Sequence, residues 1–336
     1  MANLNTAIDQ QCERFITENG LEKEVAATIA KIYKDKDVPN NLLLDKEIGI
    51  IGYGNQGRAQ ALNLKDSGLN VSIGLRGSSK NKELAKKDGF KKILDITELV
   101  KQSDLICFLV PDEKIPEIFS NHVKKNLLNH HTLVFSHGYC VHFNKLKIPN
   151  FVNVILVAPS GSGKMVRNEY VNNSGVPNLI AVHQDYTDTA LYIALSYSKG
   201  IGGTRIGAYL STFEEETVTD IFGEQVILTG GLPALIRSSF DVLISSGYSP
   251  VVAWLVCYYE VKSIIDSFHL HGFEFLNNSI SNLAEYGGAT RGEMLIDKDI
   301  KLKMKKIIDD IQDGTFENEW SKEKDNNYPV LIKERK

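Results

Sequence analysis

Short apolar runs bounded by glycine or polar residues recur through the first part of the chain. The first, residues 48–51, is followed by a helical stretch through Leu64 and a second apolar run at residues 71–73, which together predict a βαβ unit. Further candidate strands occupy residues 105–110, 132–135, 154–157 and 179–183. The pattern predicts an α/β fold, a Rossmann-type doubly wound parallel sheet over residues 30–211.

The strand pattern disappears in the second part of the chain. Three stretches place apolar side chains at helical spacing there: residues 232–246, 249–269 and 301–313. They predict an all-α C-terminal domain over residues 212–336. We expect its last residues, 323–336, which are mostly charged and polar, to form a solvated tail.

Apolar positions also recur at near-helical spacing between residues 6 and 33. They predict one or two short amphipathic helices ahead of the main fold. We assign residues 1–29 to a helical N-terminal extension that serves packing.

Composition and charge narrow the possible functions. The chain has 336 residues, of which 43% are hydrophobic, enough to form the cores of two domains. Its 38 Lys and Arg against 42 Asp and Glu give a net charge of −4, so no positive field favours nucleic acid or an anionic membrane. The four cysteines form no close pairs, the first residues contain no apolar leader, and no apolar run approaches a membrane span. We expect a cytoplasmic protein without nucleic-acid or membrane partners.

The sequence GYGNQG, residues 52–57, connects the first predicted strand to the helix after it. It matches the G-x-G-x-x-G fingerprint of dinucleotide sites, and this strand–helix context makes the match specific. Gly52 would form the tight turn, Gly54 would let the backbone approach the pyrophosphate, and Gly57 would let the helix pack on the strand. A glycine-rich turn without a ligand is the disfavoured alternative. The predicted cofactor-binding residues here are Gly52, Tyr53, Gly54, Gln56 and Gly57.

The loop after the second predicted strand, residues 74–81, contains no carboxylate. An NAD site usually has an acidic residue there for the ribose 2′-hydroxyl. Arg76 and Ser79 instead suit a 2′-phosphate through charge-assisted hydrogen bonds. The loop therefore favours NADP over NAD. A solvated basic loop is the alternative, above all for Lys80.

Carboxylates on the predicted helices suggest a metal site. Asp220 and Glu224 stand four residues apart and share a helix face, where like charges repel by roughly 0.2–0.5 kcal/mol unless a cation lies between them. Carboxylate oxygens suit magnesium. A solvated acidic face is the alternative, which the pattern alone favours, and we assign the neighbouring glutamates to such a face: Glu214, Glu215 and Glu216.

Glu260 ends an apolar and aromatic stretch, residues 253–259. A carboxylate buried there would need a partner. A metal ion, an ion pair with Lys262 and exposure at the helix edge are all open, and the pattern by itself favours exposure.

Six segments, in this order, resemble ketol-acid reductoisomerase of the short form: GYGNQG (52–57), LVPDEKIPEIF (109–119), FSHGYCVHF (135–143), GIGGTR (200–205), TDIFGEQ (219–225) and SISNLAEYG (279–287). The resemblance runs from about residue 30 into the C-terminal region. It implies a Rossmann domain followed by a knotted helical domain for catalysis and dimerisation. It also implies a magnesium-dependent alkyl shift in a 2-hydroxy-2-alkyl-3-oxo acid, followed by NAD(P)H reduction to a 2,3-dihydroxy acid.

The resemblance assigns roles to individual residues. Asp220 corresponds to the carboxylate that bridges two magnesium ions, and Glu224 to a ligand of one of them. His137, which without the resemblance would be a surface-loop histidine, corresponds to the active-site histidine beside the nicotinamide and the metals. Glu260 corresponds to a second-metal ligand from the partner subunit, and Ser281 to the serine that binds the substrate carboxylate across that interface. The resemblance therefore implies a homodimer or higher homo-oligomer with a shared site.

Five further positions bear on the cofactor and the chemistry. Ser79 matches a phosphate-binding serine, Asn81 stands where NADP-using members often have another serine, and Gly163 is a further predicted cofactor contact. Ser160 replaces the family's lysine beside the metals. Val256 replaces a second-metal glutamate one helical turn before Glu260.

Both replacements affect the alkyl shift, which needs one oxygen deprotonated and the adjacent carbonyl polarised, whereas hydride transfer needs a positioned nicotinamide and one Lewis acid. The first hypothesis is therefore a divergent enzyme of specialised metabolism, acting with nicotinamide and magnesium on a small hydroxy, dihydroxy or keto acid, for example in forming a cyclopropanol ring from a sulfonium dihydroxy acid. The second is an ordinary ketol-acid reductoisomerase of branched-chain amino-acid biosynthesis, converting 2-acetolactate to 2,3-dihydroxyisovalerate. The third is a non-catalytic dinucleotide-binding protein.

Overall fold

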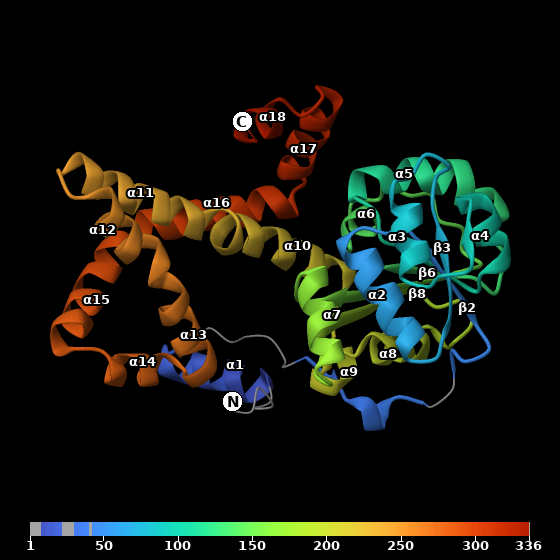
Figure 1. Ribbon diagram of the computed structural model, residues 1–336, viewed down its shortest axis with the longest axis horizontal. Helices are drawn as coiled ribbons and strands as arrows, with labels where there is room; N and C mark the ends of the chain where they lie inside the picture. Colours follow the sequence, from blue (N-terminus) through green and yellow to red (C-terminus); the bar gives the residue numbers. More distant parts are fainter. Residues whose placement is uncertain (1–7, 22–29, 40–41, 336) are drawn as a thin grey trace. The chain divides into compact units, whose positions relative to one another are not determined.

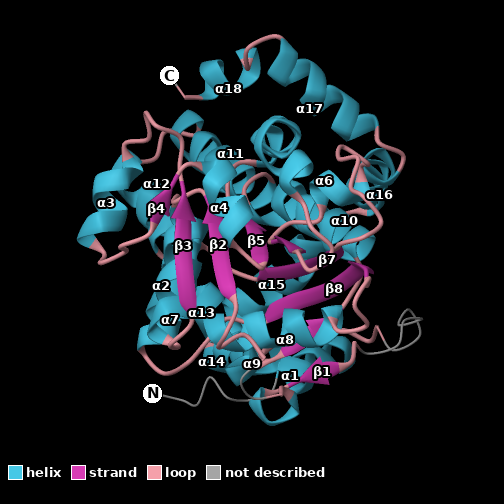
Figure 2. Cartoon of the chain, turned by 90° about the vertical axis from the view of Figure 1, so that its right-hand side faces the viewer, coloured by secondary structure: helices cyan, strands magenta, loops and turns pink. Residues whose placement is uncertain are grey.

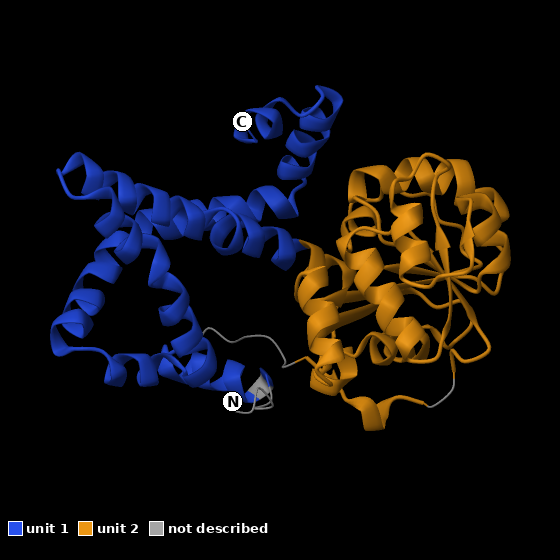
Figure 3. Ribbon diagram, in the orientation of Figure 1, with its two compact units in different colours: residues 1–28, 218–336 blue, residues 29–217 orange. Residues whose placement is uncertain are grey.

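The computed structural model describes residues 8–21, 30–39 and 42–335. The chain divides into two compact units, residues 29–217 and residues 1–28 with 218–336 (Figure 3). In the described part of the first unit, which Figure 1 draws with helices around a sheet, nine strands form one sheet in the order β1-β9-β8-β7-β6-β5-β2-β3-β4. The strands are β1 (Ile32–Tyr33), β2 (Glu47–Ile51), β3 (Asn70–Gly74), β4 (Ile93–Leu94), β5 (Leu105–Phe108), β6 (Thr132–Phe135), β7 (Asn153–Pro159), β8 (Asn178–Gln184) and β9 (Ala208–Leu210).

Helices cover both faces of this sheet (Figure 2). They are α2 (Asn55–Asp66), α3 (Asn81–Lys87), α4 (Ile96–Gln102), α5 (Ile115–Ile118), α6 (Tyr139–His142), α7 (Gly163–Val171), α8 (Ala190–Ile201) and α9 (Gly203–Ile206). In β2, Ile48 and Ile50 belong to the same buried cluster as Leu64 of α2. A Cβ at Gly49 would instead lie 2.8 Å from the side chain of Leu99 on α4. Because alternate strand residues point to opposite faces, α2 and α4 lie on opposite sides of the sheet.

The sheet is mixed, whereas the sequence predicted a parallel one. β7 pairs antiparallel with β8, and β1 pairs antiparallel with β9, while the other neighbouring strands are parallel. A strand that is buried on both faces is an apolar run in either direction, so the pattern of residues 179–183 carries no information about its direction. The predicted α/β Rossmann-type class itself is confirmed.

The second unit is helical, as the sequence predicted. Its helices are α1 (Ile8–Glu18), α11 (Gly231–Ser245), α12 (Pro250–Trp254), α13 (Val261–His271), α14 (Phe273–Ser279), α15 (Asn282–Leu295), α16 (Lys298–Gln312), α17 (Thr315–Asp325) and α18 (Pro329–Glu334), and α10 (Phe213–Gly223) crosses the boundary between the units. Of the predicted N-terminal helices, α1 lies in the described residues, residues 22–29 lie outside them, and Ile32 belongs to a strand.

Most described residues of the tail expected over residues 323–336 are exposed, as expected, but the chain is helical there and continues as α17 and then α18. The carboxylate of Glu323 accepts the backbone N–H groups of Val330 (2.8 Å) and Leu331 (3.1 Å). A side chain that satisfies the free N–H groups of a helix start stabilises that helix. Glu323 therefore lets a polar and charged segment form α18.

Helices of the second unit expose large apolar side chains, among them Leu283 (82% exposed), Met294, Val251 and Leu302 (each 67%). The segment Phe213–Ser245 also has the length and mean hydropathy, 1.4, of a membrane-crossing helix, on length and composition alone. The sequence reading, which found no such run, missed it. Exposed apolar faces of this extent are typical of surfaces that another molecule covers.

Candidate active site

The glycine-rich sequence at residues 52–57 connects β2 to α2. Gly52 has φ +102°, a left-handed conformation, and a Cβ there would lie 2.4 Å from the carbonyl oxygen of Leu109. A Cβ at Gly54 would meet no atom within 4 Å, so the first turn of α2 is open on this side. A Cβ at Gly57 would lie 2.6 Å from the carbonyl oxygen of Gly52. The loop therefore has the tight turn, the open approach and the close packing that a pyrophosphate site needs.

A cavity of about 250 Å³ extends from this loop to the loop after β3, where Arg76 and Ser79 line it. The Oγ of Ser79 accepts the backbone N–H of Asn81 (3.3 Å), and the Asn81 amide donates to the carbonyl oxygen of Tyr53 (2.9 Å). The Asn81 side chain thus fixes the backbone of the glycine-rich loop at Tyr53. The lining also includes residues of α4, of α5 and of the turn after α5: Ile96, Glu117, Ile118, Asn121 and His122. The cavity has the mixed apolar and polar lining that an adenosine group needs.

Tyr53 has a structural contact besides its place in this cavity. Its ring is buried, and its hydroxyl donates to Oδ2 of Asp88 (2.8 Å). Arg58 donates its Nε to the same oxygen (2.7 Å) and Nη2 to Oδ1 (3.0 Å). The Arg58 guanidinium, together with the Tyr53 hydroxyl, holds the pKa of Asp88 below its usual range. The hydroxyl of Tyr53 therefore ties the glycine loop to the end of α3, and its buried ring packs edge-on against Phe90, with ring centroids 5.7 Å apart.

His137 lies in the turn between β6 and α6. Its Nδ1 is 3.0 Å from Oδ2 of Asp112, the first residue of a 3₁₀ turn that follows β5. A carboxylate can only accept here, so Nδ1 carries the proton in this hydrogen bond. Sequence reasoning did not single out Asp112. Its place directly after a buried strand, at the edge where parallel strands end, was the available signal.

The next residue, Gly138, brings α10 against the histidine turn. Its backbone N–H donates to Oε2 of Glu216 (2.7 Å). A Cβ at this position would lie 2.4 Å from Oγ1 of Thr217 and 2.6 Å from the carbonyl oxygen of Phe213. Only glycine therefore lets the first turn of α10 approach this closely.

Glu216 corrects one expectation from the sequence. Glu214 and Glu215 are exposed, as predicted for a solvated acidic face, but Glu216 is only 3% exposed. Glu216 follows the buried Phe213 by three residues and precedes Asp220 by four, so the helical period places all three on one stripe of α10. This spacing could have indicated that Glu216 is buried, but Glu216 stands in a run of three glutamates and was therefore assigned to the solvated face with the other two.

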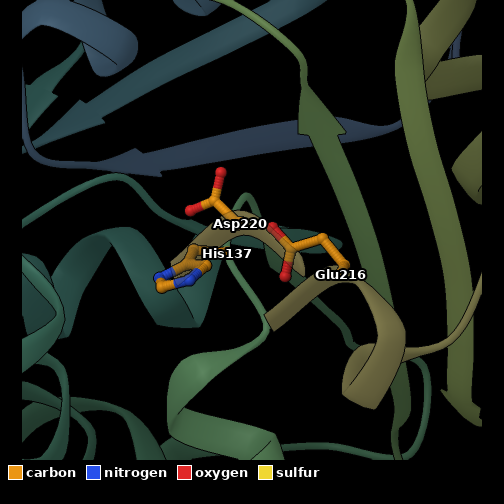
Figure 4. A group of neighbouring side chains, drawn as sticks. All are labelled: His137, Glu216 and Asp220. Carbon is orange, nitrogen blue, oxygen red and sulfur yellow. The ribbon is translucent and has the colours of Figure 1, made fainter. Parts of the chain in front are cut away.

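The ligand atoms of His137, Glu216 and Asp220 all lie within 4.8 Å of one another. Figure 4 shows the three side chains, His137 from the turn after β6 and the two carboxylates from successive turns of α10. Two carboxylates with an imidazole nitrogen form a donor set that suits a divalent cation. Glu224, the other predicted ligand on this helix, lies four residues after Asp220 and opens a π-helical turn, Glu224–Leu228.

Glu260 and Ser281 lie on the helical unit. Glu260 is exposed directly after a second π-helical turn, Leu255–Tyr259, and Lys262 pairs with Asp266 instead of with Glu260. Ser281 is exposed at the start of α15, where its Oγ accepts the backbone N–H of Ala284 (3.2 Å). Their roles across a subunit interface stay predictions.

The loop after β7 contains Ser160, and Lys164 follows four residues later. Ser160 is exposed. Lys164, in the first turn of α7, lines a cavity of about 740 Å³ together with Arg58 and Asp88, and the lining residues of this cavity do not include His137. A Cβ at the neighbouring Gly163 would lie 2.2 Å from the carbonyl oxygen of Asn55, so this glycine lets α7 start directly against the glycine loop. Lys164 therefore lines a cavity beside the glycine loop, together with Tyr53, Gly54 and Asn55.

A dinucleotide loop on a Rossmann sheet, with a histidine and carboxylates at the same edge, defines a nicotinamide-dependent, metal-assisted oxidoreductase. Two family models match the chain: "acetohydroxy acid isomeroreductase, NADPH-binding domain" over residues 42–207 and "ketol-acid reductoisomerase, C-terminal domain" over residues 213–336. The chain belongs to the ketol-acid reductoisomerase family, which confirms the resemblance seen in the sequence.

Individual relatives agree. The chain is 46% identical to the ketol-acid reductoisomerase (NADP⁺) of Methanocaldococcus jannaschii over 305 residues, which cover 90% of this chain and 92% of the relative. It is similar to the solved structure of an NADH-preferring ketol-acid reductoisomerase from an uncultured archaeon, with a TM-score of 0.87, 41% identity, and 91% and 93% of the two chains covered. A semialdehyde dehydrogenase NAD-binding protein from Cupriavidus necator, at TM-score 0.60 and 16% identity over 80% of this chain and 99% of that chain, shares the fold alone. These relatives favour the ordinary reductoisomerase over the divergent enzyme of specialised metabolism.

Proposed function

We propose that the chain is a ketol-acid reductoisomerase of branched-chain amino-acid biosynthesis, which converts 2-acetolactate to 2,3-dihydroxyisovalerate with NADPH and magnesium. The observation that supports this most is the group of His137, Glu216 and Asp220 within 4.8 Å, at the edge of a sheet that also carries the dinucleotide loop. The family relation, at 46% identity over 90% of the chain, supplies the substrate class.

Different residues bind the dinucleotide, hold the metal and transfer the proton in this proposal. The open first turn of α2 at Gly54 binds the pyrophosphate, and Arg76 with Ser79 binds the 2′-phosphate. Asp220 and Glu224 hold magnesium, which when bound polarises substrate oxygens as a Lewis acid. Asp112 keeps the proton on Nδ1 of His137. Nε2 of His137 is then the basic nitrogen, which exchanges a proton with a substrate hydroxyl.

Ser160 and Val256 are the observations that favour a second candidate, an enzyme that has kept reduction and lost the alkyl shift. Lys164, four residues after Ser160, lines the cavity that Arg58 and Asp88 also line. Hydride transfer needs less of the metal site than the shift does, because it requires only a positioned nicotinamide and one polarised carbonyl.

One experiment separates these candidates. Purified protein with magnesium and NADPH is given 2-acetolactate, which needs both steps, or 3-hydroxy-3-methyl-2-oxobutyrate, the rearranged keto acid, which needs reduction alone. We expect NADPH oxidation with both compounds and none in an Asp220→Ala variant. Turnover of the keto acid alone would identify the second candidate. Binding of NADPH without turnover of either compound would indicate a non-catalytic dinucleotide-binding protein.

We infer a soluble, cytoplasmic homodimer or higher homo-oligomer. Leu283 and Met294 expose most of their apolar surface, and a second copy of the helical unit is the partner that would cover such faces while bringing its Glu260 and Ser281 to the shared site. A second copy of the helical unit would also cover the apolar segment Phe213–Ser245, so this segment does not require a membrane. Sedimentation should give at least twice the 37.5 kDa of one chain, and a monomer at micromolar concentration would contradict the inference.

A further inference from the structure

One buried amide joins the dinucleotide loop to the histidine turn. Gln60 lies on α2 and is 0% exposed. Its Nε2 donates to Oε1 of Gln56 (3.1 Å) and to Oγ of Ser136 (3.1 Å), while its Oε1 accepts the hydroxyl of Tyr197 (2.9 Å). Both N–H groups and the carbonyl oxygen are thus engaged, which fixes the orientation of the amide.

The partners of Gln60 are themselves anchored at the ends of strands. Gln56, within the glycine-rich sequence, donates its Nε2 to the carbonyl oxygen of Gly161 in the loop after β7 (2.9 Å). Ser136, directly before His137, donates its Oγ to the carbonyl oxygen of Val157 (3.0 Å). The loops after β2, β6 and β7 therefore share one hydrogen-bonded chain with Gln60 at its centre.

The surroundings make this chain stiff. Tyr197 is fully buried, and burial raises the pKa of its hydroxyl well above the usual range. Hydrogen bonds in such a low-dielectric interior are strong, and a partner that moves leaves a buried donor or acceptor unsatisfied. If the Gln56 side chain moves, the Gln60 amide and the Ser136 hydroxyl should therefore move with it, because breaking these hydrogen bonds would leave buried polar groups without partners.

We propose that Gln60 is a positioning residue that couples occupation of the dinucleotide loop to the orientation of His137. A pyrophosphate at the first turn of α2 acts on the segment that contains Gln56, and two further hydrogen bonds reach Ser136, the neighbour of His137 in the chain. The coupling needs no contact between the nicotinamide ring and the histidine. The proposal rests on the proposed function, which places the dinucleotide at this loop.

Asn63 provides a matched control on the same helix. It is also 0% exposed, and its Nδ2 donates to the carbonyl oxygens of Val166 (3.1 Å) and Ile201 (3.2 Å), while Oδ1 accepts from Arg167 (2.8 Å). None of these bonds reaches the glycine loop or the histidine turn. Gln60→Leu and Asn63→Leu each remove one buried amide from α2, so a purely structural role predicts the same behaviour for both.

The probe is 2′-phospho-ADP-ribose, the dinucleotide without its nicotinamide ring. Binding is followed by NMR of the histidine rings in the full-length chain, with the His137 signal assigned by its loss in His137→Gln. We expect saturation to shift that signal in the wild type and in Asn63→Leu, and to shift it about 5-fold less or not at all in Gln60→Leu. Ser136→Ala breaks the same link while keeping Gln60, and tests the proposal should Gln60→Leu fail to fold.

The outcomes separate the two proposals. A wild type that does not bind the probe refutes the dinucleotide site of the proposed function, and the coupling with it. Binding without a shift of the His137 signal overturns the coupling alone. An equal loss of the shift in Gln60→Leu and Asn63→Leu assigns Gln60 a purely structural role and also overturns the proposal.

Discussion

Nδ1 of His137 lies 3.0 Å from Oδ2 of Asp112, and this hydrogen bond decides which nitrogen of the imidazole is basic. With the proton held on Nδ1, Nε2 is the nitrogen available for ligand or proton chemistry. The two residues follow β6 and β5, neighbouring parallel strands that end at the same edge of the sheet. The relationship is therefore set by the sheet and by the turns that follow its strands.

Replacing Asp112 should impair turnover without affecting dinucleotide binding. Asp112→Ala frees the imidazole to turn, and Asp112→Asn can donate to Nδ1 and stabilise the wrong tautomer. Loss of such an orienting partner typically costs 10–100-fold in activity, and we expect about that fall in kcat/KM for both variants. The Kd for NADPH, from protein fluorescence, should change by less than about 2-fold. Glu113→Gln, which alters the adjacent carboxylate, is the control, and an equal effect there would refute the assignment.

Gly138→Ala should destabilise the sheet unit. The added methyl group would meet Thr217 Oγ1 and the carbonyl oxygen of Phe213 at 2.4 and 2.6 Å, so α10 or the histidine turn must move. Overpacking of this kind costs about 1–3 kcal/mol of the free energy of unfolding. Urea unfolding measures it. Gly77→Ala, whose Cβ would meet nothing within 4 Å, should leave stability nearly unchanged. Equal stability of the two variants would contradict the close approach of α10.

Asp220→Ala should remove magnesium binding as well as turnover. Asp220 lies between Glu216 and Glu224 along α10 and its continuation, so the variant removes the central carboxylate of the expected site for a strongly hydrated cation. Calorimetric titration with magnesium should show at least about a 10-fold rise in Kd. Glu215→Gln is the control, because Glu215 is exposed on the same helix and its carboxylate accepts from Ser211 (2.6 Å). Unchanged magnesium affinity in Asp220→Ala would exclude its role as a ligand.

His131 should make the sheet unit less stable in acid. Burial lowers the pKa of this histidine from 6.5 to about 4. The unfolded chain therefore binds a proton between these values and the folded chain does not, so stability is complete above about pH 6.5 and falls as pH decreases towards 4. The loss amounts to roughly 3 kcal/mol. Urea unfolding at a series of pH values should show a shallower decline in His131→Gln than in the wild type, whereas His183→Gln, at an exposed position, should keep the full slope.

Arg76 should set the preference for NADPH. The curated relative uses NADP⁺ and the similar solved structure prefers NADH, so the choice depends on this chain's own residues. Arg76→Ala removes a charged donor for the 2′-phosphate and should raise KM for NADPH about 10-fold, while KM for NADH stays within about 2-fold. Lys80→Ala is the control on the same loop. A parallel rise for both cofactors would mean that Arg76 does not contact the phosphate.

The sequence predicted most of the sheet because β2, β3, β5 and β6 are apolar runs between polar turns. It missed β1, β4 and β9, which have two or three residues and so carry no period, and it missed the reversed direction of β8. The glycine roles could be proposed because each position has a distinct steric requirement. The environment of Glu216 could not, because its partner Gly138 lies 78 residues away in the chain. Contacts of that kind depend on tertiary packing, which no local pattern records.

The two π-helical turns have a consequence for the chain's length. Glu224 begins one of them, and Glu260 directly follows the other. A π-helical turn holds one residue more than an α-helical turn, so deleting one residue inside it lets regular winding resume with little rotation of the chain beyond. The same deletion in a neighbouring α-helical turn would rotate everything beyond it by about 100°. At these two points the enzyme should therefore tolerate the loss of one residue better than it does elsewhere in the same helices.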